Sequence, residues 1–170
     1  MFLGPLSVFL VLVSQGLAAE DRDNMMTCPY PPEESLSPCS CLVDDQIRVH
    51  LICNLHQPMD QKIMNKVSTA FACQNLVHKF EVNLHGHPWQ VDFGPDNFGL
   101  MNLRSFNLIN VSHVSGNILA GAFNKSASSL KKVKIEDSRG CNVSGACNHT
   151  VETEAFVNLR SLQSVQLGRP

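Results

Sequence analysis

The densest group of reactive side chains lies in the stretch CPYPPEESLSPCSC, which starts at Cys28 and also holds Cys39 and Cys41. With Cys53, it supplies four thiols, enough for one tetrahedral zinc ion or for two disulfide bonds. Structural zinc sites use Cys-x2-4-Cys pairs, whereas only Ser40 separates the close pair here. The spacing therefore favours disulfide bonds, and it leaves the three possible pairings open.

A second candidate for chemistry is NLHGHPWQVDFG, in which His85 and His87 form a His-x-His pair and Asp92 follows. Two imidazoles on one side of a strand can chelate zinc or copper. No third ligand follows at a metal-site spacing, although His78 is near in sequence. We therefore interpret the segment as a polar turn in which Trp89 covers an edge of the domain, and we expect no metal.

Motifs for catalysis are not visible elsewhere in the chain. The sequence contains no nucleophile elbow, phosphate-binding loop, paired-carboxylate motif or cofactor fingerprint. We therefore expect no catalytic residues, no cofactor and no enzymatic activity.

Residues 1–18 have the features of a secretory signal peptide. No charged side chain precedes Glu20, and residues 6–13 are almost entirely apolar; Gly16 and Ala18 supply the small side chains that signal peptidase requires. An uncleaved anchor helix is the alternative, since nineteen uncharged residues can just span a bilayer. We expect cleavage and a secreted, extracellular protein, in a compartment where disulfide bonds persist.

Charge and sequons narrow the class of protein further. The formal net charge is −2 and only 16% of the residues are charged, so we expect no nucleic-acid partner and no polybasic membrane patch. Apart from the leader, no segment is long enough to span a membrane. Four Asn-x-Ser/Thr sequons predict a glycoprotein with its acceptors on exposed loops, at Asn110, Asn124, Asn142 and Asn148.

A repeated apolar pattern follows the cysteine-rich region. The pattern apolar-x-x-apolar-x-apolar occurs four times, with starts 26, 27 and 32 residues apart, and repeats of this length indicate stacked units. Its positions are Val77/Phe80/Val82, Leu103/Phe106/Leu108, Leu130/Val133/Ile135 and Leu162/Val165/Leu167. Each of the last three is preceded by a phenylalanine, namely Phe98, Phe123 or Phe156. Stacked units would collect these rings in one buried column; ordinary core phenylalanines of an unrelated α/β domain are the alternative.

The stretch CPYPPEESLSPCSCLVDDQIRVHLIC resembles the N-terminal cap of extracellular leucine-rich repeat proteins, and the line Phe156, Leu159, Leu162, Val165 and Leu167 matches their Phe-x-x-Leu-x-x-Leu-x-x-Leu-x-Leu pattern. Together with a short helix between them, these features are similar to a group of secreted arthropod leucine-rich repeat proteins that includes the non-catalytic subunit of a shrimp luciferase. The resemblance implies an α/β leucine-rich repeat solenoid. Its short parallel β-sheet would lie on the concave side, its convex side would be irregular or short-helical, and disulfides would stabilise its N-terminal cap.

The family's crossed disulfide pairing would join Cys28 to Cys41 and Cys39 to Cys53. One departure concerns the position that usually holds a ladder-forming asparagine, which is His85, Val111 and Ser138 here. We therefore expect degenerate repeats whose turns are stabilised in another way.

These patterns predict four regions. Residues 1–18 are the signal peptide, and residues 19–56 form the cap, in which CLVDDQIRVHLIC predicts a β-hairpin. Residues 57–75 form a helical connector, with apolar residues at helical spacing and Pro58 in the first turn. Residues 76–170 hold about three to four repeats, and we expect the chain to be a fragment of a longer protein.

Two further features concern the remaining cysteines. Cys141 and Cys147 predict a disulfide-closed loop inserted after the third repeat. No partner for Cys73 is evident. The loop carries two of the sequons, and we expect its glycans to shield it rather than to bind a ligand.

The repeats would display the side chains between the apolar positions on the concave sheet. We expect a secreted scaffold that binds an extracellular protein or a matrix glycan through this face. The alternatives are an auxiliary subunit of a secreted enzyme, and the ectodomain of a receptor whose anchor lies beyond this sequence. The expected binding residues are Lys79, Glu81, Ser105, Asn107, Lys132, Lys134, Ser164 and Gln166.

Overall fold

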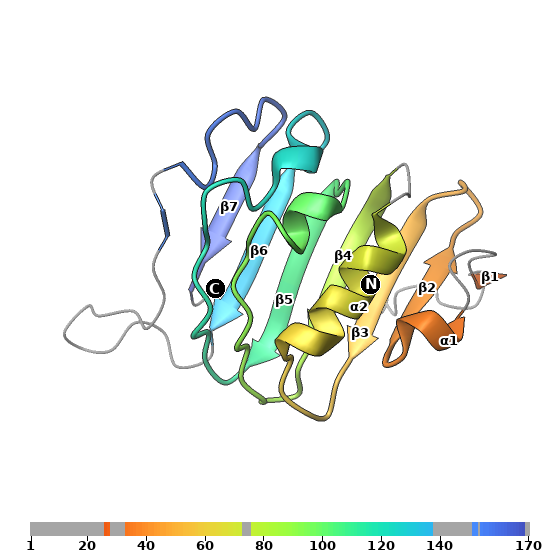
Figure 1. Ribbon diagram of the computed structural model, residues 1–170. Helices are drawn as coiled ribbons and strands as arrows, with labels where there is room; N and C mark the ends of the chain where they lie inside the picture. Colours follow the sequence, from red (N-terminus) through yellow and green to blue (C-terminus); the bar gives the residue numbers. More distant parts are fainter. Residues whose placement is uncertain (1–25, 28–32, 73–75, 138–150, 153, 169–170) are drawn as a thin grey trace, which may run out of the picture.

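The computed structural model describes residues 26–27, 33–72, 76–137, 151–152 and 154–168. These residues form a mixed α/β fold built on a seven-stranded sheet, in which the strands lie side by side in chain order from β1 to β7 (Figure 1). Several expectations lie outside the described residues. They concern the signal peptide of residues 1–18 and the side chains of Cys28, Cys73, Cys141, Cys147, Asn142 and Asn148.

The cap forms the antiparallel end of the sheet. Strand β2 (Cys39–Val43) pairs with β1 (Met26–Thr27) on one side and with β3 (Val49–Asn54) on the other, so the expected hairpin is present. A disulfide bond joins Cys39 to Cys53, the pair that the resemblance implied, and both sulfurs lie in the core. Cys41 is also disulfide-bonded. Helix α1 (Glu33–Leu36) precedes β2.

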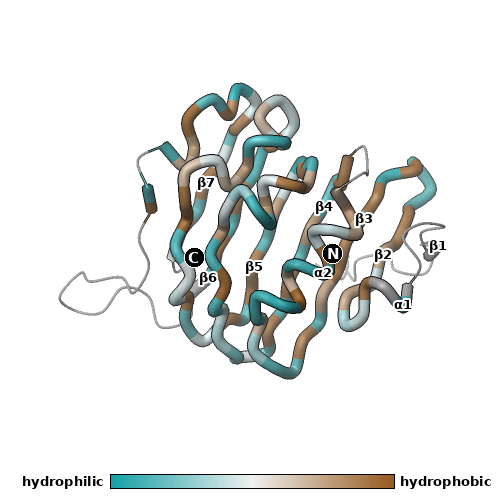
Figure 2. The backbone as a smooth tube through the Cα atoms, in the orientation of Figure 1, coloured by the Kyte–Doolittle hydropathy of each residue, from teal (hydrophilic) through white to brown (hydrophobic). Residues whose placement is uncertain are grey.

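Beyond β3 every strand pairs in parallel with the next. The strands are β4 (Val77–Asn83), β5 (Ser105–Val111), β6 (Lys132–Asp137) and β7 (Ser164–Leu167). The apolar pattern sets their register, because Phe80 pairs with Phe106, Phe106 with Val133, and Val133 with Val165. Figure 2 shows apolar and polar residues alternating along these strands, as expected for a sheet with one buried face.

Burial follows the same rows of residues. Phe80, Phe106 and Val133 are fully buried. Burial of each of these side chains contributes about 1.5–3 kcal/mol to the free energy of folding. On the outermost strand, β7, Val165 remains 41% exposed because a neighbouring strand covers it on one side only. The pattern thus predicted both the face and the lateral partner of each strand.

The connector between cap and β4 is a helix, as predicted, but it starts later than expected. Helix α2 spans Gln61–Phe71, and the side chain of Asp60 caps it by accepting a hydrogen bond from the Ile63 N–H at 2.9 Å. Pro58 therefore precedes the helix and does not lie in its first turn. The apolar side of α2 packs against the sheet (Figure 1), where Met64 and Val67 are fully buried.

The segments that return from one parallel strand to the next also pair with each other. Isolated parallel bridges link Met59 to Trp89 and Trp89 to Val114, and a second series links Phe93 to Ile118. Two short 3-10 helices, η1 (Phe98–Leu100) and η2 (Asn124–Ser126), complete these segments. Each strand and its return segment, which we call a unit, is therefore hydrogen-bonded to its neighbour on both sides of the core.

These bridges correct our interpretation of the segment around Trp89. We expected a polar turn with Trp89 at an edge, whereas the indole is fully buried and its Nε1 donates a hydrogen bond to the Val91 carbonyl at 2.5 Å. The ring stacks on Phe93 with centroids 5.0 Å apart. Trp89 thus belongs to the core on the side opposite the sheet.

The three phenylalanines that precede the strands do form one column. The ring centroids of Phe98 and Phe123 lie 5.9 Å apart, and those of Phe123 and Phe156 are also separated by 5.9 Å. Phe98 and Phe123 are buried, while Phe156 is only half-buried. The three rings thus lie next to one another, as the spacing of the phenylalanines predicted.

Candidate functional site

The sheet leaves one face uncovered by α2, and we call it the open face. Along each strand, alternate side chains point away from the core. In β4, for example, Phe80 and Val82 are buried whereas Lys79 and Glu81 are partly exposed. The open face is therefore made of the outward side chains of β2 to β7.

All eight side chains expected on the concave face lie on the open face, in two neighbouring rows. In the row nearer the amino ends of the strands, Ser105 pairs with Lys132 and Lys132 with Ser164. The other row runs Glu81, Asn107, Lys134 and Gln166. Lys79 lies beside His50 of the cap, so the cap strand β3 extends the same surface.

Ion pairs neutralise part of this surface. Lys79 Nζ lies 3.0 Å from Glu81 Oε2, and Lys134 pairs with Glu136. Exposed pairs of this kind contribute only about 0–1 kcal/mol to folding. A charged partner can therefore replace either carboxylate at little cost to stability.

An apolar hollow lies at the cap end of the open face. It has a cavity volume of about 210 Å³ and is lined by Ser40, Leu42, Ile52 and Asn54. Leu42 and Ile52 point away from the cysteines, because they alternate with Cys41 and Cys53 along β2 and β3. We did not predict the hollow from the sequence, although the alternation of Leu42 and Ile52 with the buried cysteines indicates that these two apolar side chains face outward.

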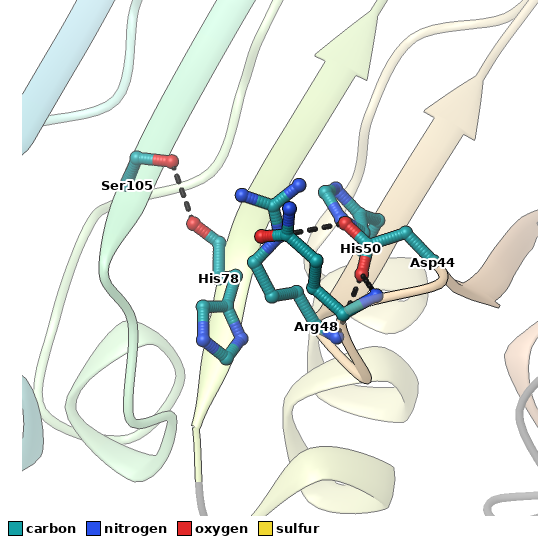
Figure 3. Close-up of polar contacts among 6 residues, drawn as sticks. Asp44, Arg48, His50, His78 and Ser105 are labelled. Atoms are coloured by element: carbon teal, nitrogen blue, oxygen red, sulfur yellow. Dashed lines mark hydrogen bonds and ion pairs between the residues drawn. The ribbon is translucent and has the colours of Figure 1, made fainter. Parts of the chain in front are cut away.

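The hairpin turn of the cap carries a hydrogen-bonded acid, Asp44, which the sequence pattern did not single out. Asp44 is 8% exposed. Its carboxylate accepts hydrogen bonds from the backbone N–H of Gln46 at 3.0 Å, the backbone N–H of Arg48 at 2.9 Å and the Arg48 Nε at 2.6 Å. His50 Nε2 lies 3.0 Å from Oδ2. Figure 3 shows Arg48 and His50 converging on this carboxylate.

These contacts determine the protonation state of Asp44. Burial alone would raise its pKa, but the hydrogen bonds from Arg48, His50 and Gln46 outweigh that effect and hold the pKa well below its usual range. Asp44 is therefore a stable anion that fixes Arg48 and His50 at the amino end of β3.

His78 lies beside this cluster at the start of β4. Its backbone carbonyl accepts a hydrogen bond from Ser105 Oγ at 2.8 Å (Figure 3). Burial lowers the pKa of His78, and electrostatic interactions with Arg104, His50 and Arg48 lower it further, against the opposing effect of Asp44. Burial is the main reason that the charged form of this imidazole is disfavoured.

Asparagines stabilise the turn at the other end of β4 and β5, one or two residues earlier than the expected ladder position. Asn83 Oδ1 accepts hydrogen bonds from the His85 backbone N–H at 3.1 Å and from Asn110 Nδ2 at 3.2 Å. Asn110 has a φ of 52°, a conformation that asparagine tolerates better than most residues. The ladder therefore uses Asn83 and Asn110 rather than His85 and Val111.

Two of the four predicted glycosylation sites lie within the described residues. Asn110 is exposed at the end of β5, and Asn124 is exposed in η2, so neither lies on a loop as we had expected. The Ser126 hydroxyl of the second sequon is fully buried and donates a hydrogen bond to the Met101 carbonyl at 2.8 Å. A glycosylating enzyme that must contact this hydroxyl could therefore reach it only before the protein folds.

The His-x-His pair does not converge on a third ligand. The rings of His85 and His56 stack with centroids 4.2 Å apart, and His78 lies at the opposite end of β4. Within the described residues, no three His, Cys, Asp or Glu side chains lie close enough together to hold a metal ion. The described part of the chain also contains no helix long and apolar enough to cross a bilayer.

The chain matches no protein-family model, no curated protein and no solved structure.

Proposed function

We propose that this protein is a secreted leucine-rich repeat glycoprotein that acts as a non-catalytic scaffold and binds an extracellular protein or a matrix glycan through its open face. The observation that carries this proposal is the pair of side-chain rows on the open face, which continue in register across β5 to β7, with one row extending to Glu81 of β4. A surface built from several rigid strands holds its side chains in fixed relative positions. Such preorganisation lowers the entropic cost of binding.

The solenoid part of the proposal has its own support. Successive parallel strands share one apolar register, their return segments are bridged on the far side of the core, and Phe98, Phe123 and Phe156 stack in a column. Stacked repeats bury a continuous core in this way, because each unit covers the open side of its neighbour.

Deletion of one complete unit tests the solenoid. Removal of residues 103–129 places Leu130 after Asn102, in the phase that Leu103 now occupies. A repeat architecture predicts a shorter protein that still unfolds cooperatively, since nearest-neighbour contacts are restored. Removal of residues 103–116 leaves the apolar positions out of phase and serves as the matched control. A unit deletion that unfolds the protein as completely as the control would falsify the stacked-unit architecture.

Binding through the open face is tested by capture from the extracellular fluid of the source tissue. The wild-type protein is compared with Lys134→Glu on the open face and with Lys62→Glu on α2, which reverses an exposed charge away from that face. We expect Lys134→Glu to reduce the bound material and Lys62→Glu to leave it unchanged. Equal binding by all three proteins would exclude the open face as the binding surface.

The hollow supports a more specific alternative, an auxiliary subunit of a secreted enzyme. Leu42 and Ile52 offer an apolar recess beside charged side chains, and buried apolar anchors dominate protein interfaces. Stoichiometric co-purification with an enzyme, abolished by Ile52→Asp, would support this alternative. A bound matrix component without an enzyme would favour the independent scaffold.

A further inference from the structure

Basic side chains gather at the amino ends of the parallel strands, along one edge of the open face. We call this edge the basic margin; it consists of Arg48, His50, His78, Arg104, Lys131 and Lys132. The backbone aligns its members across the strands. The Arg104 N–H donates to the Val77 carbonyl and the Lys131 N–H donates to the Arg104 carbonyl, each at 2.8 Å. Lys132 pairs with Ser105 in the next row.

Few carboxylates balance this charge. Asp44 contacts the margin, but it is almost fully buried and already accepts hydrogen bonds from Arg48 and His50. Glu81 and Glu136 lie further along the strands and are paired with lysines of their own.

The cations at the centre of the margin therefore have no carboxylate partner among the residues that the structure describes. Within the described part of the chain, no ion pair joins Arg104, Lys131 or Lys132 to a carboxylate. A chain with a net charge of −2 thus carries a local concentration of positive charge that its composition does not reveal.

His78 lies within reach of part of this charge. Its pKa is lowered first by burial and then by interactions with Arg104, His50 and Arg48, so a proton added to His78 would meet the positive charge of the nearby guanidinium groups. The Nδ1 atom of His78 is buried and has no hydrogen-bond partner among the described residues. An anion that neutralises the margin relieves this repulsion.

We propose that the basic margin binds a sulfated glycan of the extracellular matrix, an inference that rests on the proposed function of the open face and specifies its ligand. Adjacent strands are spaced about 5 Å apart, so the margin is a line of basic side chains that crosses the strands and fits a linear polyanion. Arginine forms paired hydrogen bonds with planar or tetrahedral oxyanions, and lysine supplies mobile point charges.

A glycan fits the margin better than an acidic polypeptide does. Ser105 and Lys132, which pair across the margin, are both polar. Protein interfaces derive most of their affinity from buried apolar and aromatic anchors. The apolar hollow is lined by residues of β2 and β3 that do not belong to the margin.

Immobilised heparin, a sulfated glycan, is the probe for the secreted full-length protein. Arg104→Gln and Lys131→Gln are compared with Lys62→Gln, which removes an exposed positive charge on α2. We expect each margin variant to elute at lower salt and to reduce the slope of log affinity against log salt by about one, as for other polyanions. Lys62→Gln should elute with the wild type. Because all three side chains are at least partly exposed, thermal melts should show unchanged folding.

Three results would overturn the proposal. If Lys62→Gln lowered the salt concentration of elution as much as the margin variants do, heparin would be bound by charge spread over the whole surface rather than by the margin. Equal retention on heparin from which the sulfates have been removed would exclude sulfate recognition. Equal competition by polyglutamate at the same charge concentration would assign the margin to an acidic polypeptide instead.

An NMR titration of the His78 ring gives an independent measurement. A sulfated glycan on the margin stabilises the imidazolium form, so we expect soluble heparin to raise the pKa of His78 toward its ordinary value. An unchanged pKa with saturating heparin would contradict binding at this site. If the protein ignores heparin but captures a protein through the open face, this inference fails while the proposed function stands.

Discussion

Gly116 lies so close to Val91 of the preceding unit that a Cβ atom added to the glycine would stand 1.8 Å from the Val91 carbonyl oxygen. The contact lies on the side of the core opposite the sheet, between the bridges that pair Trp89 with Val114 and Phe93 with Ile118. Neighbouring units therefore touch through backbone atoms as well as through side chains, and no flexible side chain can move to relieve a clash.

Substitution of Gly116 should accordingly destabilise the protein. We expect Gly116→Ala to lower the free energy of unfolding by about 3 kcal/mol or more, because the two backbones must separate. Gly94→Ala is the matched control, since its Cβ would meet only the Leu119 Cδ1 at 3.4 Å. Urea denaturation of both variants provides the measurement. Similar stabilities for the two would show that the units do not approach as closely as described.

The phenylalanine column predicts a graded response to truncation. Phe123 is buried between Phe98 and Phe156, whereas Phe156 is half-buried at the end of the column. Phe123→Ala should reduce the free energy of unfolding by about 3–5 kcal/mol, because it leaves a cavity in the core. Phe156→Ala should cost about 1–2 kcal/mol, because less apolar surface is lost. Equal losses in thermal or urea unfolding would contradict this gradient.

The Ser126 hydroxyl has a structural role that can be measured separately from its role in the Asn124 sequon. The hydroxyl accepts a hydrogen bond from the Leu103 N–H and donates one to the Met101 carbonyl, both at 2.8 Å. Ser126→Ala should cost about 1–3 kcal/mol by leaving a buried N–H unpaired. It also removes the Asn124 sequon, so Asn124→Gln is the control that removes the sequon and keeps the hydroxyl. Stability measured after enzymatic deglycosylation should fall only for Ser126→Ala; an equal fall for Asn124→Gln would contradict a specific role of the Ser126 hydroxyl.

Asp44 predicts a pH dependence of stability at acid pH. Its pKa in the folded protein lies below the unfolded value of about 4, so its contribution is present above that value and is lost as the pH falls toward the folded pKa. Asp44→Asn should therefore be less stable than the wild type at pH 7, and the difference should shrink below about pH 4.

Asp45→Asn controls for the loss of a nearby exposed carboxylate. Denaturant midpoints measured from pH 2 to pH 7 provide the comparison. A difference between Asp44→Asn and wild type that stays constant over this range would show that the carboxylate charge does not stabilise the hairpin turn.

The sequence determined the features that depend on local spacing. Phe80, Phe106 and Val133 recur at nearly constant intervals, and alternation along a strand decides which side chains face the core. The register of β4 to β7, the column of phenylalanines and the eight outward side chains followed from this spacing. The helix of the connector was also predicted from its apolar period, although its start depended on the Asp60 cap.

Only the tertiary structure decided the features that depend on contacts between units. Trp89 has polar and charged neighbours in sequence, yet it is buried because Met59 and Val114 flank it in space. Arg104 and Lys131 are distant in sequence and meet only when β5 and β6 pair in register. Local periodicity fixes the direction of a side chain, whereas its charge environment and its lateral neighbours are set by segments some 26 residues away. For that reason the sequence predicted an outward-facing surface, and the fold alone revealed where its charge and its apolar hollow lie.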